Sequence, residues 1–170
     1  MAELAPDSGE PRWLVCQTKP RCEKKFAALL GAEKFEHYLP LTVSVRRYGR
    51  QTKRFTKPLF SGYVFACVPP AKKTRIYQQD LLARAIVVED EALFLRQLAE
   101  VRLIIASGHE LSVLPLLTRG RRVRIIGGAL HGLEGFIDDS TNPQGVVLSV
   151  DVLRQGLLVK MPVEQLQVLP

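Results

Sequence analysis

The chain has 170 residues, of which 46% are hydrophobic and 24% charged, and its formal net charge is +7. This length suffices for one sizeable core or two small ones, and the composition is that of a globular rather than a disordered chain. Apolar runs stop far short of the roughly 18 residues that span a bilayer, and residues 1–11 lack the basic and apolar regions of a signal peptide. We therefore expect a cytoplasmic protein that does not associate with membranes.

Residues 13–18 form an almost unbroken apolar run, which predicts a central strand covered on both faces. Pro20 stands where a first helical turn would begin. Apolar side chains then recur at helical spacing, at Cys22, Phe26, Leu29 and Leu30. The sequence therefore predicts an amphipathic helix that packs on the sheet containing the first strand.

The positive charge is concentrated in residues 37–79, which contain nine Lys or Arg and no Asp or Glu. Two extended arms, residues 42–48 and 50–57, flank a turn at Tyr48, Gly49 and Arg50, which predicts a hairpin or long loop in solvent. Cations interleaved with Tyr48 and Phe55 are typical of a nucleic-acid contact. A basic hairpin that is merely solvated stays open. The candidate phosphate-binding residues of this hairpin are Arg46, Arg47, Arg50, Lys53 and Arg54.

A second apolar strand is predicted at residues 63–68, and Leu59 and Phe60 stand just before it. By pattern alone these side chains could be core or an exposed apolar patch. A short polar helix near residues 72–79 and a third apolar run at 85–88 follow. Asp90 can cap a further helix, whose apolar stripe is Phe94, Leu98, Val101 and Ile105. Strands and helices on one sheet predict an α+β domain.

Residues 107–118 break the helical period and are predicted to be a linker, although they are unusually apolar. Beyond them Val123 and Ile125 alternate with Arg122 and Arg124, as in a strand with one buried face. Further short strands are expected at residues 136–137, 146–152 and 157–161. Strands this short cannot each bury a face, so we predict that five of them close into a small β-barrel.

No catalytic constellation accompanies these elements. The three histidines lie in different segments, without the spacing of a Ser-His-Asp triad, a Cys-His pair or a metal site. Cys16, Cys22 and Cys67 are predicted to be buried, reduced thiols. Residues 127–132 are glycine-rich but lack the Gly-Lys-Ser/Thr ending of a phosphate loop. We expect a protein that is not an enzyme and needs no cofactor or metal.

Both halves of the chain resemble the NusG family of transcription elongation factors, in the family's order. The first half resembles the NusG N-terminal (NGN) domain in Trp13-Leu14-Val15, Glu23-Lys24-Lys25, Leu39-Pro40 and Pro58-Leu59-Phe60-Ser61-Gly62-Tyr63-Val64-Phe65. In the second half, residues 120–135 resemble the KOW motif of small SH3-like barrels. We therefore expect an NGN domain at residues 12–106, with an antiparallel sheet and flanking helices, a linker at 107–118 and a KOW domain at 119–170.

The resemblance implies binding to RNA polymerase, with suppression of pausing and termination. It places Leu59, Phe60, Tyr63 and Phe65 at a surface for the clamp helices of the largest subunit, and Thr74 and Arg75 toward the gate loop. Lys19 and the basic hairpin would then lie near upstream or non-template DNA. The partner of the KOW domain stays open between the ribosome, Rho and neither, and we expect a monomer.

Residues 17–21 and 57–60 are more similar to the specialised members of the family, RfaH and the capsule-operon antiterminators, than to the general factor. Ser61 and Ala129 depart from the prolines that are common at these points. A general NusG-type role stays an alternative, as does a ribosomal RNA-binding protein with a KOW motif. Valines and interspersed glycines at residues 132–159 favour strands over helix, so the second domain is predicted to be a stable barrel.

Overall fold

The structure is a computed structural model that describes residues 9–115, 120–137 and 144–170. It divides into two compact units, Met1–Glu91 and Ala92–Pro170. The predicted domain boundaries at residues 106 and 119 stay predictions, because a compact unit in one conformation need not be a unit of folding. Part of the predicted linker, residues 116–118, and residues 138–143, between two predicted strands, lie outside the described residues.

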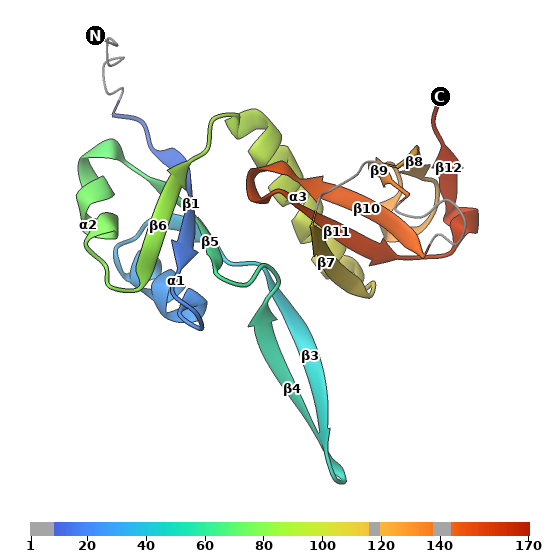
Figure 1. Cartoon of the computed structure of the whole chain (residues 1–170), viewed down its shortest axis with the longest axis horizontal. Helices are drawn as coiled ribbons and strands as arrows, with labels where there is room; N and C mark the ends of the chain where they lie inside the picture. Colours follow the sequence, from blue (N-terminus) through green and yellow to red (C-terminus); the bar gives the residue numbers. More distant parts are fainter. Residues whose placement is uncertain (1–8, 116–119, 138–143) are drawn as a thin grey trace. The chain divides into compact units, whose positions relative to one another are not determined.

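A four-stranded antiparallel sheet, in the order β2-β5-β1-β6, forms the first unit (Figure 1). The central strands β1 (Arg12–Thr18) and β5 (Tyr63–Val68) are the two predicted apolar runs. Leu14 and Cys16 of β1 are completely buried, and Val15 on the opposite face is 1% exposed, so both faces of this strand are covered as predicted. The edge strands are β2 (Glu36–Tyr38) and β6 (Leu82–Val87).

Two helices cover one face of this sheet. Phe26 and Leu30 of α1 (Glu23–Ala32) and Ile76 of α2 (Lys73–Tyr77) pack in one core with Leu14 and Cys16. Burying a side chain such as Phe26 contributes about 1.5–3 kcal/mol, so these contacts dominate the attachment of the helices. A short 3₁₀ turn, η1 (Pro70–Lys72), leads into α2.

Helix α1 ends because the chain turns into the left-handed region at Lys34, where φ is +60°. The Lys34 N–H donates to the Gly31 carbonyl and the Phe35 N–H to the Leu30 carbonyl, both at 3.0 Å. This is the Schellman pattern, which satisfies the last carbonyls of a helix. Phe35 then packs beside Leu30 in the core.

The predicted basic hairpin is confirmed as a separate two-stranded sheet of β3 (Leu41–Tyr48) and β4 (Gln51–Pro58). Figure 1 shows this ribbon extending away from the four-stranded sheet of the same unit. Tyr48 pairs with Gln51, which leaves a two-residue turn of Gly49 and Arg50. Gly49 has φ +61°, a conformation that glycine adopts without strain and that a tight hairpin turn requires at this position.

The second unit consists of most of α3 (Glu91–Ser107) and a six-stranded antiparallel sheet in the order β12-β8-β9-β10-β11-β7. Short 3₁₀ turns link some of its strands. Its strands are β7 (Leu111–Pro115), β8 (Arg122–Ile125), β9 (Glu134–Phe136), β10 (Gly145–Val150), β11 (Gln155–Lys160) and β12 (Leu166–Val168), and the turns are η2 (Gly128–Leu130), η3 (Asp151–Leu153) and η4 (Val163–Gln165).

Two details of the second unit differ from the sequence prediction. The sheet has six strands rather than five, because Leu111–Pro115, assigned to the linker, pairs with β11 as the edge strand β7. Pro115 is tolerated there because an edge strand has one side without ladder hydrogen bonds. The buried stripe of α3 ends on Ile104, which is 0% exposed, rather than on the predicted Ile105, which is half-buried.

None of the described helices is long and apolar enough to cross a membrane.

Candidate functional site

The loop between β4 and β5 carries the apolar residues singled out in the sequence, and backbone hydrogen bonds fix its path. The Leu59 N–H donates to the Pro40 carbonyl at 2.8 Å, and the Tyr63 N–H donates to the Phe60 carbonyl at 3.2 Å. Gly62, with φ +84°, accepts from the Thr18 N–H at 2.8 Å through its carbonyl. The loop is therefore tied both to the entry of the hairpin and to the end of the central strand β1.

A buried carboxylate completes this support. The Gly62 N–H donates to Oε1 of Glu23 at 2.9 Å, and Glu23 is 7% exposed at the first position of α1. A buried acceptor without a partner is costly, so this hydrogen bond couples the position of the loop to the helix. The sequence resemblance includes Glu23 but assigns it no role, because the contact joins residues 39 positions apart.

The neighbouring Lys24 holds the hairpin in the same way. Its Nζ donates to the carbonyl of Thr56 at 2.6 Å and to the Thr56 hydroxyl at 3.1 Å. Two consecutive residues at the start of α1 thus support the apolar loop and β4 of the basic hairpin. This arrangement makes α1 the common anchor of both candidate surfaces.

Four of the predicted polymerase-binding residues lie in one segment, residues 59–65, but they differ in exposure. Leu59 and Tyr63 are half-buried, whereas Phe60 is 1% exposed and Phe65 is completely buried. Leu59 and Tyr63 can thus offer side-chain surface, whereas Phe60 and Phe65 offer almost none. The role of all four in binding stays a prediction.

Two further residues were predicted to face the gate loop of the polymerase. They are Thr74 and Arg75, and both are exposed on α2. Nη1 of Arg75 is 2.7 Å from Oε2 of Glu33, and both side chains are solvent-accessible. Exposed ion pairs of this kind contribute about 0–1 kcal/mol, so Arg75 can exchange this partner for another at little cost.

The candidate nucleic-acid residues fall on two segments. Lys19 is exposed in the connection between β1 and α1, where its N–H donates to the Leu81 carbonyl at 2.9 Å. The other five residues lie together on the hairpin, and all are exposed: Arg46, Arg47, Arg50, Lys53 and Arg54. Lys53 Nζ stands over the Tyr48 ring, 5.8 Å from its centroid, which is a cation–π geometry.

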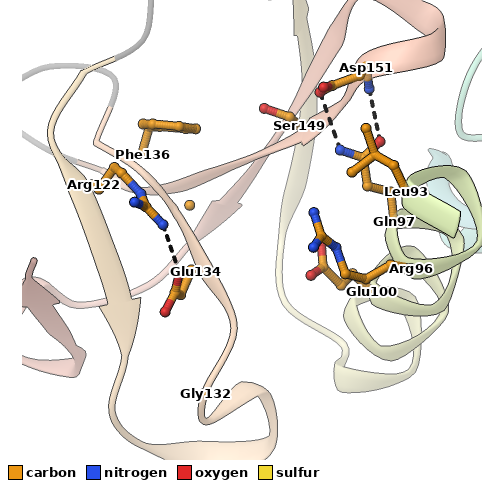
Figure 2. A pocket seen from close by; sticks show the side chains of 11 residues that line it. Leu93, Arg96, Gln97, Glu100, Arg122, Gly132, Glu134, Phe136, Ser149 and Asp151 are labelled. Carbon is orange, nitrogen blue, oxygen red and sulfur yellow. Dashed lines mark hydrogen bonds and ion pairs between the residues drawn. The ribbon is translucent and has the colours of Figure 1, made fainter. Parts of the chain in front are cut away.

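A pocket of about 410 Å³ lies between α3 and the sheet of the second unit (Figure 2). Gln97 and Asp151 form a reciprocal pair across it: Gln97 Nε2 donates to Asp151 Oδ1 at 3.2 Å, and the Asp151 N–H donates to Gln97 Oε1 at 3.0 Å. The sequence analysis did not single out this pair. Its contacts hold α3 to the sheet.

The pocket's charged groups also engage one another. Glu134 accepts hydrogen bonds from Arg124 at 2.6 Å and from Arg122 at 3.0 Å. These hydrogen bonds lower the pKa of Glu134, and the one from Arg124 has the larger effect. Burial raises the pKa of Glu100. The positive charge of Arg96 lowers this pKa, and the negative charge of Glu134 raises it. These carboxylates and guanidinium groups serve internal contacts, so the pocket gives no ground for assigning it chemistry.

The cysteines are free thiols, with Cys16 buried and Cys22 and Cys67 half-buried. Burial raises the pKa of the Cys16 thiol to about 12, which keeps it protonated and weakly nucleophilic at neutral pH. Within the described residues, no group of three His, Cys, Asp or Glu side chains is placed to hold a metal ion. The expectation that the chain is not an enzyme stays a prediction from the residues alone.

Comparisons with known proteins cover parts of both units. The family model described as "Transcription termination factor nusG" matches residues 11–116. Among solved structures, the chain is similar to one described as "Domain interaction in Thermotoga maritima NusG", with 16% identity, a TM-score of 0.52, and coverage of 95% of this chain and 98% of that one. A second similar structure is the "MjSpt4:Spt5 complex conformation B", with 14% identity, a TM-score of 0.31, and coverage of 92% and 96%. No curated protein sequence matches the chain.

Proposed function

Because this chain belongs to the NusG family of transcription factors, we propose that it binds RNA polymerase during elongation and suppresses pausing and termination. The observation that carries the proposal is the family match over residues 11–116, which includes the whole apolar loop and the basic hairpin. A ribosomal RNA-binding protein with a KOW motif would not need this preceding region. The match therefore favours a transcription factor over that alternative.

The contact with the clamp helices would be made by Leu59 and Tyr63, the two of the four predicted residues that offer side-chain surface, while Phe60 and Phe65 are buried. A few well-packed apolar and aromatic side chains usually carry most of the energy of a protein interface. The loop's hydrogen bonds to Pro40, Thr18 and Glu23 support the proposal, because a preorganised loop loses little entropy on binding. Thr74 and Arg75 on α2 would face the gate loop.

We propose further that the factor acts on a restricted set of operons rather than on all transcripts. The support is the likeness of residues 17–21 and 57–60 to the specialised antiterminators. Residues 119–170 would act as the KOW domain, because the motif-like residues 120–135 contain β8, the following turn and the start of β9. The ribosome and Rho are the candidate partners of this domain, and a domain without either partner stays the third alternative.

A binding measurement with purified core RNA polymerase tests the polymerase contact. Leu59→Ala and Tyr63→Ala should each weaken binding about tenfold or more, as interface hot spots do. Val163→Ala is a matched control, since Val163 is apolar and 46% exposed but lies in the second unit. Full retention of affinity in the double variant Leu59→Ala, Tyr63→Ala would refute the assignment.

Phe60→Ala is unsuitable for this purpose. Removing a fully buried phenylalanine typically costs about 3–5 kcal/mol of stability, so lost binding could reflect lost fold. The thermal transition of Trp13 fluorescence should accompany every binding measurement, because Trp13 is the only tryptophan of the chain and lies on the central strand of this unit.

An elongation assay separates the restricted from the general role. Polymerase is halted and released on two templates, one carrying the leader sequence of a candidate operon and one with that leader scrambled. A restricted factor should shorten pauses on the first template only. Equal effects on both templates would support the general NusG-type role instead.

A further inference from the structure

The hairpin carries two chemically different faces, and the strand register assigns each residue to one of them. Residues directly opposite in an antiparallel pair share a face, and alternate residues along a strand share a face. Arg46 pairs with Lys53, Ser44 with Phe55 and Tyr48 with Gln51. These residues therefore lie on one side, together with Lys57, which pairs with Thr42. We call this side the aromatic face, defined by Arg46, Tyr48, Lys53, Phe55 and Lys57.

The opposite side, the valine face, is defined by Val43, Val45, Arg47 and Arg54. Val45 pairs with Arg54, Val43 with Thr56 and Arg47 with Thr52. The five hairpin cations predicted from the sequence are thereby separated. Arg46 and Lys53 belong to the aromatic face, Arg47 and Arg54 to the valine face, and Arg50 lies in the turn.

Rings and cations alternate along the aromatic face. From the turn inward come Tyr48, then the Arg46–Lys53 pair, then Phe55, then Lys57. Tyr48 and Phe55 are four residues apart along the ribbon, which is about 13 Å at the rise of a strand. Tyr48 is 52% exposed and Phe55 43% exposed, so both rings offer surface to solvent.

Exposed rings spaced by cations match the chemistry of a single-stranded nucleic acid. Its bases can leave their stack and lie on aromatic rings, while its phosphates meet the intervening cations. The bases of a duplex are stacked on one another, so a duplex offers these rings no base face and would use the cations alone. The valine face has cations but no ring, so it can serve phosphates only.

We infer that the aromatic face of the β3–β4 hairpin is a binding site for single-stranded nucleic acid, in which Tyr48 and Phe55 stack on bases and Arg46, Lys53 and Lys57 contact phosphates. The inference rests on the proposed function and on the expectation from the sequence that the hairpin lies near DNA, and it specifies the ligand and the side of the ribbon that binds it. Arg47 and Arg54, although equally basic, are not part of this site.

Fluorescence anisotropy with the full-length protein and labelled oligonucleotides tests the inference without polymerase. The probes are a single-stranded oligothymidine, an oligouridine of equal length and a DNA duplex. Tyr48→Ala with Phe55→Ala should raise the Kd for the single strands about tenfold or more, since stacking on each ring contributes strongly to affinity. It should leave the duplex Kd within about twofold, because the duplex uses only the cations. The two single-stranded probes distinguish DNA from RNA as the preferred ligand.

Val43→Ala with Val45→Ala is the matched control, because it removes two side chains that are 61% and 57% exposed on the other face. It should leave all Kd values unchanged. Equal losses in the two double variants, or an equal loss for duplex and single strand in the aromatic variant, would overturn the inference. Tyr48→Phe should bind as the wild type does, since the ring is kept.

A comparison of two charge-matched double variants tests whether the hairpin is only a basic patch without a preferred face. Arg46→Ala with Lys53→Ala and Arg47→Ala with Arg54→Ala each remove two positive charges from the same ribbon. The first pair should weaken single-strand binding several-fold more than the second. Equal weakening would show that the hairpin acts as an undirected basic patch, and would overturn the assignment to one face. Unchanged polymerase binding in all these variants would leave the proposed function standing whichever way the oligonucleotide results fall.

Discussion

Glu23 shows how one buried side chain can govern a surface that it does not form. Its carboxylate accepts from the Gly62 N–H, and Gly62 sits between the two half-buried candidate contact residues Leu59 and Tyr63. Glu23 is only 7% exposed, so it offers little surface to a large partner. We therefore regard Glu23 as a positioning residue for the apolar loop rather than as a contact residue.

Exchanging this carboxylate separates positioning from contact. Glu23→Ala leaves the Gly62 N–H without its acceptor and should lower the free energy of unfolding by about 1–3 kcal/mol. It should also weaken polymerase binding. Glu23→Gln keeps an acceptor oxygen and should retain most of the stability and most of the affinity for polymerase. Urea unfolding followed by Trp13 fluorescence, together with the polymerase-binding measurement, provides the comparison.

The exposed neighbour Lys25 supplies the control, because Lys25→Ala changes the same helical turn without touching the loop. The positioning role is wrong if Glu23→Ala leaves stability and binding as they are in Lys25→Ala.

At the scale of elements, the close approach of β9 and β10 depends on a residue without a side chain. A Cβ at Gly135 would lie 2.5 Å from the Val147 carbonyl oxygen and 2.6 Å from Cγ2 of Val146. Neither atom belongs to the flexible end of a long side chain. The two strands would have to separate to admit even a methyl group.

Gly135→Ala should therefore destabilise the second unit by about 1–3 kcal/mol through overpacking. Hydrogen exchange of the β10 amides should accelerate, while the Trp13 fluorescence transition of the first unit should stay in place. Gly127→Ala is the matched control, since its Cβ would meet nothing nearer than 4.0 Å and its φ of −154° suits any residue. Equal exchange rates in the two variants would show that the strands adapt.

The elements that could be predicted have local sequence signals, whereas the elements that were missed depend on contacts between distant residues. β1, β5 and the hairpin were predicted because apolar runs and a turn with glycine are local signals. β7 was missed because Leu111–Pro115 contains a proline and becomes a strand by pairing with β11, whose paired residues are 40 to 48 positions away. The end of the α3 stripe at Ile104 likewise depends on which face of the helix is packed, which helical period alone does not decide.

The same distinction between local signals and distant contacts applies to the candidate site. The basic residues and the apolar loop were found from composition and motif. The separation of Arg46 and Lys53 from Arg47 and Arg54 was not, because it follows from the strand register. The buried environment of Phe60 and the contacts of Glu23 and Lys24 also required the tertiary structure.

For the whole molecule, the position of charge matters more than its sum. Residues 37–79 contain nine of the 24 Lys and Arg and none of the 17 Asp and Glu. The remaining 15 basic and 17 acidic residues leave a balance of −2, and adding the nine cations restores the net +7. The hairpin carries six of those nine cations, Arg46, Arg47, Arg50, Lys53, Arg54 and Lys57.

This distribution predicts how nucleic-acid affinity depends on salt. Arg46→Ala with Lys53→Ala lowers the formal net charge from +7 to +5, and so does Arg102→Ala with Arg121→Ala on exposed positions of the second unit. If each hairpin cation neutralises one phosphate of a single strand, the first pair should reduce the slope of log K against log salt concentration by about 1.4, since each contact contributes about 0.7. The second pair should leave the slope unchanged, because its charges release no counterions from the bound strand.

Titrations at salt concentrations from about 50 to 200 mM, a range over which binding to nucleic acid weakens strongly, would measure both slopes. Equal reductions would mean that Arg102 and Arg121 contact phosphate as the hairpin cations do, and that the bound strand is not confined to the hairpin, because counterion release depends only on the cations that touch phosphate.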